Sequence, residues 1–219
     1  MDGSRSLEEL THIRGLMDRS TRFLSLSGLS GVWAGVVALA GASAARIHYR
    51  SMDGIDRLSR FQGEGHALTD RLEDPAYAAH LRFLVIDAAV VLVVALAGAM
   101  WFTWRRSRGM GQGLWDGSAQ RMVWNLLVPL AAGGAFCLAL IWHNDVFLVA
   151  PATLVFYGLA LVNASKYTLT EVRWLGYSEI VLGIVACFWT STGLLFWAIG
   201  FGALHIIHGM LMYMRNERK

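Results

Sequence analysis

Three ionisable side chains lie inside the long apolar stretches of the C-terminal third of the sequence. Glu179 is near the middle of one stretch, and His205 and His208 are near the middle of the next. An ionisable group in the centre of a bilayer costs on the order of a few kcal/mol, so it normally faces a partner, a cavity or water. If the chain reverses at about residue 192, Glu179 lies at the depth of His205, with His208 one turn further in. The pattern therefore predicts an intramembrane polar site.

Three interpretations of this trio stay open. A buried hydrogen bond from Glu179 to a histidine would fix the hairpin. A proton or cation relay in a transport path would use the same pair, because histidine gains and loses a proton near neutral pH. Two histidines and a glutamate could also ligate zinc or haem iron, although a further ligand would have to come from elsewhere. The pattern does not specify a cofactor.

Asp87 is a fourth candidate site residue, because it interrupts the apolar segment 83–104. It is close enough in sequence to Arg82 to reach that side chain or the headgroup layer instead. Cys137 and Cys187 fall inside apolar segments, where a thiol usually behaves as a small hydrophobe. We find no serine elbow, cysteine–histidine pair, paired metal motif or glycine-rich phosphate loop, and this disfavours an enzyme.

The composition is that of a membrane protein. Of 219 residues, 55% are hydrophobic and 16% are charged, and the mean hydropathy is +0.45. The net charge of +3 does not indicate nucleic-acid binding, because the basic residues flank apolar runs instead of forming one stripe with aromatic residues. The lipid bilayer is the expected partner.

Six apolar segments approach the length of about 20 residues that a helix needs to cross the hydrocarbon core. The sequence thus predicts an all-α bundle of six transmembrane helices. Only length and the turn-forming residues 190–193 divide the last two segments. The predicted spans are 23–45, 83–104, 122–142, 146–165, 174–191 and 194–214.

The distribution of basic residues predicts that both termini are cytoplasmic, in a bacterial inner membrane. With that orientation, thirteen of the nineteen lysines and arginines flank the spans on the inner side, as the positive-inside rule requires. The other six lie in one outer loop, 46–82, and are Arg46, Arg50, Arg57, Arg60, Arg71 and Arg82.

Two parts of the chain are expected. Residues 1–22 form an amphipathic helix at the cytoplasmic interface, because the apolar residues of 5–22 share one side. Residues 23–219 form the transmembrane domain, including the outer loop. In an alternative, residues 42–44 are a signal-peptidase site and residues 1–44 are removed. The charges of the leader, which nearly cancel, disfavour that alternative.

Small residues recur every four positions on the first and last spans, and such faces let helix backbones approach closely. They could serve internal packing or a homo-oligomer, and the residues are Ser27, Gly31, Gly35, Ala198 and Gly202. Asn125 and Asn163, at matched depth on the third and fourth spans, are expected to form an interhelical hydrogen bond.

The segments RSTRFLSLSGLSGVWAG (19–35), PATLVFYGLALVNASKYTL (151–169) and FWAIGFGALHIIHG (196–209) resemble an uncharacterised family of six-span bacterial inner-membrane proteins. The resemblance implies the same architecture but no activity or cofactor. Similar proteins have tyrosine where this chain has His208, which weakens a two-histidine ligand set.

The leading functional prediction is a non-enzymatic helical bundle that moves or senses a small ion or solute through the polar site. The second is a structural or accessory subunit without transport. The third is a metal- or haem-binding membrane enzyme.

Overall fold

A computed structural model describes residues 22–51, 74–111, 113, 115–143 and 145–218. Every regular element in these ranges is helical. The predicted amphipathic helix and the central part of the outer loop, residues 1–21 and 52–73, lie outside the described residues. The elements are α2 (Gly28–Ser51), α5 (Pro75–Gly109), α6 (Gly117–Trp142), η1 (Val146–Leu148), α7 (Val149–Ala164), η2 (Ser165–Tyr167), α8 (Thr170–Phe188), η3 (Thr190–Thr192), α9 (Gly193–Trp197), η4 (Ala198–Leu204) and α10 (His205–Asn216).

Five stretches of the described chain are helical, long and apolar enough to cross a membrane. They contain α2, α5, α6, α7 and the continuous α9–η4–α10 helix. The fifth predicted span, 174–191, corresponds to α8, which has 19 residues but carries Glu171, Arg173 and Glu179 and is not among these five. The all-helical fold is confirmed, and the length and composition of the five helices are those of a membrane protein. The reversal predicted at 190–193 is also confirmed, because α8 ends at Phe188 and the next long helix begins at Gly193.

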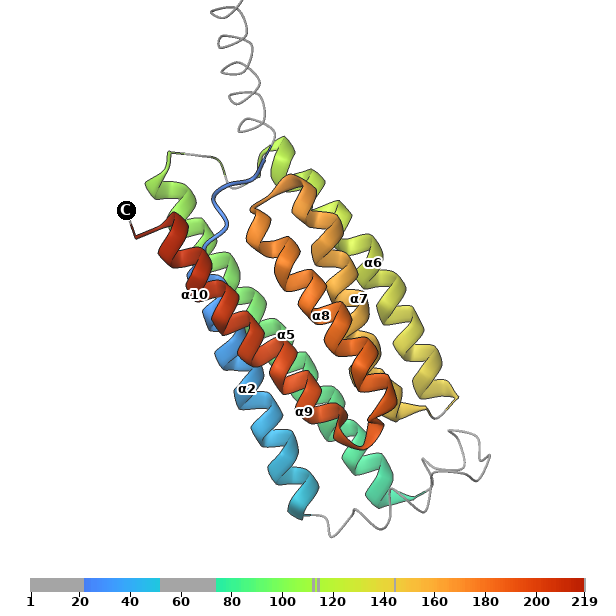
Figure 1. Cartoon of the computed structure of the whole chain (residues 1–219). Helices are drawn as coiled ribbons and strands as arrows, with labels where there is room; N and C mark the ends of the chain where they lie inside the picture. Colours follow the sequence, from blue (N-terminus) through green and yellow to red (C-terminus); the bar gives the residue numbers. More distant parts are fainter. Residues whose placement is uncertain (1–21, 52–73, 112, 114, 144, 219) are drawn as a thin grey trace, which may run out of the picture.

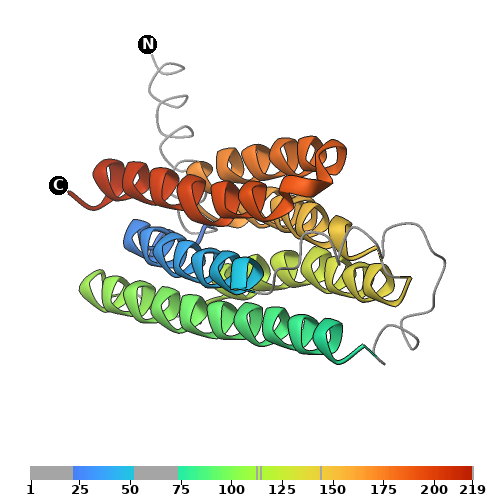
Figure 2. The same cartoon turned by 90° about the horizontal axis from the view of Figure 1, so that it is seen from below.

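The helices form two groups of three (Figures 1 and 2). In one group α2 packs between α5 and α10, and in the other α7 packs between α6 and α8. The groups meet where α7 and α8 contact α9, η4 and α10. Two hairpins, α6–α7 and α8–α9, follow directly from apolar segments joined by short turns.

The first helix differs from its prediction. It begins at Gly28 instead of residue 23, and it continues to Ser51, beyond the predicted end at 45. The main chain of Phe23 is used elsewhere, since its N–H donates to the Tyr167 carbonyl at 2.7 Å and its carbonyl accepts from the Thr168 hydroxyl at 2.9 Å. A hydropathy pattern cannot reveal such distant pairing, so it extended the predicted helix through residues 23–27, which are not helical.

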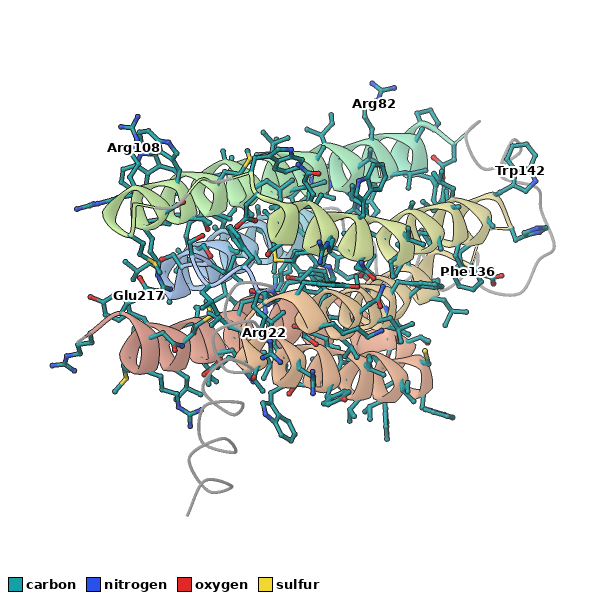
Figure 3. All side chains as sticks on the ribbon, turned by 90° about the horizontal axis from the view of Figure 1, so that it is seen from above. Arg22, Arg82, Arg108, Phe136, Trp142 and Glu217 are labelled. Atoms are coloured by element: carbon teal, nitrogen blue, oxygen red, sulfur yellow. The ribbon has the colours of Figure 1, made fainter. Side chains whose placement is uncertain are left out.

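Helix α5 lies at the edge of the bundle and is longer than its predicted span. Among the described helices it packs extensively only on α2. Arg82 and Arg108, near its two ends, both extend away from the bundle (Figure 3). One contact between α2 and α5 is polar: the Trp33 indole N–H donates to the Val94 carbonyl at 3.0 Å. This bond satisfies a polar group that would otherwise face hydrocarbon.

Glycines set two of the closest helix contacts. A methyl group added at Gly31 of α2 would lie 3.2 Å from Gly209 Cα on α10. Between α7 and α8, a methyl group at Gly176 would lie 2.8 Å from the Gly158 carbonyl oxygen. Small residues at these crossings let the backbones touch, as the sequence pattern on the first and last spans indicated.

The small-residue faces named from the sequence are used inside the chain. A Cβ at Gly35 would lie 2.6 Å from the Gly202 carbonyl oxygen, and Ser27 is buried. Ala198 is half-buried. Asn163 also contacts its predicted neighbour, because its side-chain amide donates to the Asn125 carbonyl at 2.9 Å.

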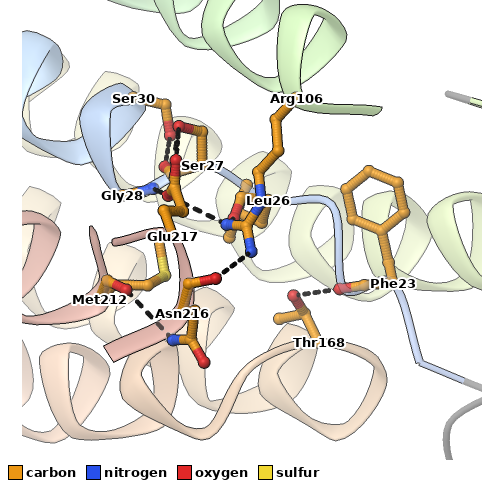
Figure 4. Close-up of polar contacts among 10 residues, drawn as sticks. All are labelled: Phe23, Leu26, Ser27, Gly28, Ser30, Arg106, Thr168, Met212, Asn216 and Glu217. Carbon is orange, nitrogen blue, oxygen red and sulfur yellow. Dashed lines mark hydrogen bonds and ion pairs between the residues drawn. The ribbon is translucent and has the colours of Figure 1, made fainter. Parts of the chain in front are cut away.

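Glu217 joins the C-terminal end of α10 to the start of α2 (Figure 4). Its carboxylate accepts hydrogen bonds from the Ser27 hydroxyl at 3.1 Å and from the Gly28 main-chain N–H. A carboxylate at this position also interacts favourably with the dipole of α2. Glu217 thus acts as the N-terminal cap of a helix far away in the sequence.

Arg106 completes the same cluster from the end of α5. Its guanidinium lies 3.0 Å from the Glu217 carboxylate and donates to the carbonyls of Leu26 and Asn216. Both charged side chains are at most 14% exposed. We call Arg106, Glu217 and Ser27 the end clamp, because together they tie α5, α2 and α10 at one end of the bundle.

Candidate functional site

Glu179 lies near the middle of α8 and is completely buried, with 0% of its surface exposed. Neither carboxylate oxygen has a hydrogen-bond partner among the described residues. Gly200 lies directly against it, since a methyl group at Gly200 would come within 2.5 Å of Oε2. An acidic side chain in such surroundings requires either a proton or a nearby positive group.

His205 is the group that faces Glu179. Its Nδ1 atom lies 3.4 Å from Glu179 Oε1 and 3.0 Å from the Gly200 carbonyl oxygen. Two oxygen acceptors face one nitrogen, so Nδ1 carries the hydrogen. The imidazole is 5% exposed and immediately follows the π-helical turn η4.

Tyr157 of α7 completes the site on the opposite edge of the imidazole. Its hydroxyl oxygen lies 2.8 Å from His205 Nε2, and the two rings are stacked with their centroids 5.3 Å apart. The sequence analysis missed this residue, although a tyrosine in the middle of an apolar span at the depth of Glu179 was a usable signal. We call Glu179, His205 and Tyr157 the buried triad.

The triad joins three separate helices. Tyr157 comes from α7, Glu179 from α8 and His205 from α10. Phe201 covers one side, with ring centroids 4.9 Å from Tyr157 and 5.8 Å from His205. Leu154, fully buried, packs beside Gly200. The polar atoms therefore sit in an apolar shell that strengthens their electrostatic interaction.

The π-helical turn explains how His205 reaches the triad. Residues 198–204 form a wider turn than an α-helix, and such turns often occur at functional sites. Within it, Gly200 directs its carbonyl to the imidazole five residues later. The hydropathy pattern could not predict this local geometry.

His208 and Asp87 lie apart from the triad. His208 is half-buried, and its Nδ1 contacts the Leu204 carbonyl of its own helix at 3.0 Å. Asp87 is on α5, where its Oδ2 would lie 3.4 Å from a methyl group at Gly41 of α2. Among the described residues it forms no ion pair with Arg82. The structure thus joins two of the four predicted site residues and adds Tyr157.

The described residues contain no group of three or more histidine, cysteine, aspartate or glutamate side chains that could hold a metal ion. Glu179 and His205 supply two such ligands, and His208, the third predicted ligand, is directed to its own backbone. No family model, curated protein or solved structure matches this chain. The functional argument therefore depends on the geometry of the triad.

Proposed function

We propose that this chain is an integral membrane protein that binds a proton at the buried triad and uses it to move or sense a small ion or solute. The observation that carries the proposal is the full burial of Glu179 with no hydrogen bond to either oxygen. His205 is its ion-pair partner among the described residues, at 3.4 Å. A buried carboxyl group of this kind must be neutralised by a proton or by a nearby cation.

The two sides of the imidazole have different partners, as a proton relay requires. A proton given by the Tyr157 hydroxyl to Nε2 can be matched by transfer of the Nδ1 proton to Glu179. Tyr157 is then reprotonated from one side and Glu179 releases its proton to the other, so one proton has moved. The imidazole hydrogen must return from Nε2 to Nδ1 before the next cycle. Histidine is suited to this role because both ring nitrogens can carry the proton.

We propose a membrane topology in which α8 is a sixth crossing and both termini are cytoplasmic. Helix α8 runs beside α7, and its 19 residues correspond to about 28 Å at 1.5 Å per residue, close to the thickness of the hydrocarbon core. Glu171 and Arg173 lie in its first turns, which leaves Glu179 as the one charged group further along it. The basic residues near the span ends support a bacterial inner-membrane orientation.

The experiment follows the proton directly. The full chain is reconstituted in lipid vesicles, and infrared difference spectra are recorded between acidic and alkaline buffer. We expect a carbonyl band from a protonated, poorly solvated carboxyl group. The band should vanish in Glu179→Gln and persist in Glu171→Gln, a control on the same helix whose carboxylate pairs with the exposed Arg215 at 3.8 Å.

A flux measurement connects the site to transport. Vesicles containing a pH-sensitive dye should change internal pH faster with the wild-type chain than with Glu179→Gln when a proton gradient is imposed. Equal rates for wild type, Glu179→Gln and protein-free vesicles would contradict transport. If the carbonyl band is equally strong in Glu179→Gln and Glu171→Gln, proton binding at Glu179 is itself contradicted.

A structural role is the second candidate, because the contacts of His205 connect α7, α8 and η4. This alternative predicts that Glu179→Gln lowers thermal stability in detergent while flux and pH response stay unchanged. The metal or haem enzyme remains the third proposal. It predicts stoichiometric metal or a haem absorption band in the purified chain.

A homo-oligomer remains a proposal as well. The faces first suggested for it, at Gly31, Gly35 and Gly202, are covered by the contact between α2 and the last helix. Another face would therefore have to form the interface.

A further inference from the structure

The end of α5 presents two tryptophan–arginine pairs on the outside of the bundle. The Arg108 guanidinium carbon lies 4.1 Å from the Trp104 ring centroid, and that of Arg105 lies 5.9 Å from Trp101. Both tryptophans are exposed, at 50% for Trp101 and 40% for Trp104. We call these four residues the tryptophan–arginine surface.

Neighbouring arginines on this turn have separate roles. Arg106 points inward and is held by Glu217 and two backbone carbonyls. Arg105 and Arg108 are exposed, and neither has a carboxylate partner within the described part of the chain. Arg108 extends away from the helices (Figure 3). The surface therefore has positive charge that the end clamp does not neutralise.

The position along α5 corresponds to the headgroup layer. The helix has 35 residues, about 52 Å at 1.5 Å per residue, whereas the hydrocarbon core is only ~30 Å thick. Its apolar run ends at the two tryptophans, and the arginines follow at once. Tryptophan rings prefer this layer of the bilayer.

We propose that the tryptophan–arginine surface binds the phosphate of an anionic phospholipid at the C-terminal end of α5. An arginine stacked on an indole keeps the N–H groups at its edge free, and these donate in pairs to phosphate oxygens. The tryptophan rings lie beside the glycerol and upper acyl chain of the same lipid. Because α5 packs extensively only on α2, the outward face of the surface is accessible from the membrane.

The test measures lipid selectivity of the full chain. Protein is reconstituted with an equimolar mixture of phosphatidylglycerol and phosphatidylcholine and extracted gently, and the lipids that remain bound are counted by native mass spectrometry. We expect phosphatidylglycerol to be enriched on the wild-type chain. Each arginine near the surface should contribute roughly fivefold to that preference, so Arg105→Gln with Arg108→Gln should remove most of it.

Matched variants separate this surface from general charge attraction. Arg82→Gln removes an exposed arginine from the other end of α5 and should leave the enrichment unchanged. Trp104→Leu keeps all arginines but removes one stacking ring, and it should reduce the enrichment by about half or more if the pair acts as a unit.

Three outcomes would overturn the proposal. The first is equal enrichment on the wild-type chain and the double variant, with circular dichroism showing that both are folded. The second is that Arg82→Gln loses as much phosphatidylglycerol enrichment as the double variant does. The third is full displacement of the lipid by millimolar inorganic phosphate, which would identify a site for the free anion instead.

Discussion

Glu217 and Glu179 are both poorly exposed glutamates, at 12% and 0% of their side-chain surfaces, yet they have opposite surroundings. Glu217 receives hydrogen bonds from a hydroxyl, a helix N-terminus and an arginine. Glu179 receives none from the described residues and faces one histidine. Fixed donors and a guanidinium surround the first carboxylate, whereas the second has an imidazole nearby and no hydrogen bond within the described part of the chain, and the proposed proton site depends on that difference.

Under the proposed function, this difference separates a structural acidic residue from a proton-binding one. A buried charge that serves stability is surrounded by donors, because an uncompensated charge is strongly unfavourable. A site that must bind and release a proton cannot be satisfied completely in one state. Four substitutions follow in order of decreasing expected effect on stability, and the first and the last, at the two glutamates, test this distinction directly.

Glu217→Gln should give the largest loss of stability. The amide cannot pair with the Arg106 charge and is a weaker acceptor for the Gly28 N–H, so we expect the free energy of unfolding to fall by about 3 kcal/mol. Unfolding in mixed micelles measures this value. Glu171→Gln, whose partner Arg215 is 69% exposed, should change it by less than about 0.5 kcal/mol.

Gly176→Ala should destabilise the chain by about 2 kcal/mol, because the new methyl group would have to displace α7 from α8. It would come within 2.8 Å of the Gly158 carbonyl oxygen. Gly134→Ala is the control, since a methyl group there meets nothing within 4 Å. A similar melting temperature for both variants would show that the α7–α8 contact is not tight.

Tyr157→Phe should remove the hydrogen bond to His205 Nε2 at a loss of about 1 kcal/mol. If the triad relays protons, the same variant should also slow proton flux, which a purely structural bond would not do. Tyr177→Phe, on the exposed side of α8, should leave both stability and flux unchanged.

Glu179→Gln should have the smallest effect on stability, within about 1 kcal/mol, because the carboxyl group has no hydrogen-bond donor to lose among the described residues. Its effect should appear instead in proton binding and flux. A stability loss as large as that of Glu217→Gln would remove the distinction between the two glutamates.

Much of the helical architecture could be predicted from the sequence, because apolar runs bounded by charges define helices in a bilayer. The reversal after Phe188 and the approach of Glu179 to His205 followed from length and depth alone. The start of α2 could not be predicted in this way, because the backbone of Phe23 pairs with Tyr167, far away in the sequence. Six crossings and the cytoplasmic termini stay predictions.

The candidate site could be predicted only in part, because depth does not specify direction around a helix axis. His208 lies one turn from His205, but its imidazole contacts the Leu204 carbonyl of its own helix. Asp87 lies on α5, which packs on α2 and away from the triad. Tyr157 was missed because a tyrosine in an apolar span resembles an ordinary core residue. The end clamp was missed as well, since Arg106 and Glu217 looked like ordinary flanking charges.

The wide turn at Ala198–Leu204 sets the rotation of the helix before it against the helix after it. Before the turn, Gly193 faces Ala150 of α7, and after it His205 faces α8 and Gly209 faces α2. Deleting a single residue from 198–204 would tighten the turn and rotate one half of the helix against the other by roughly 100°. Either Gly193 would leave α7, or His205 and Gly209 would together leave Glu179 and Gly31, so the surplus residue is what keeps both halves in phase.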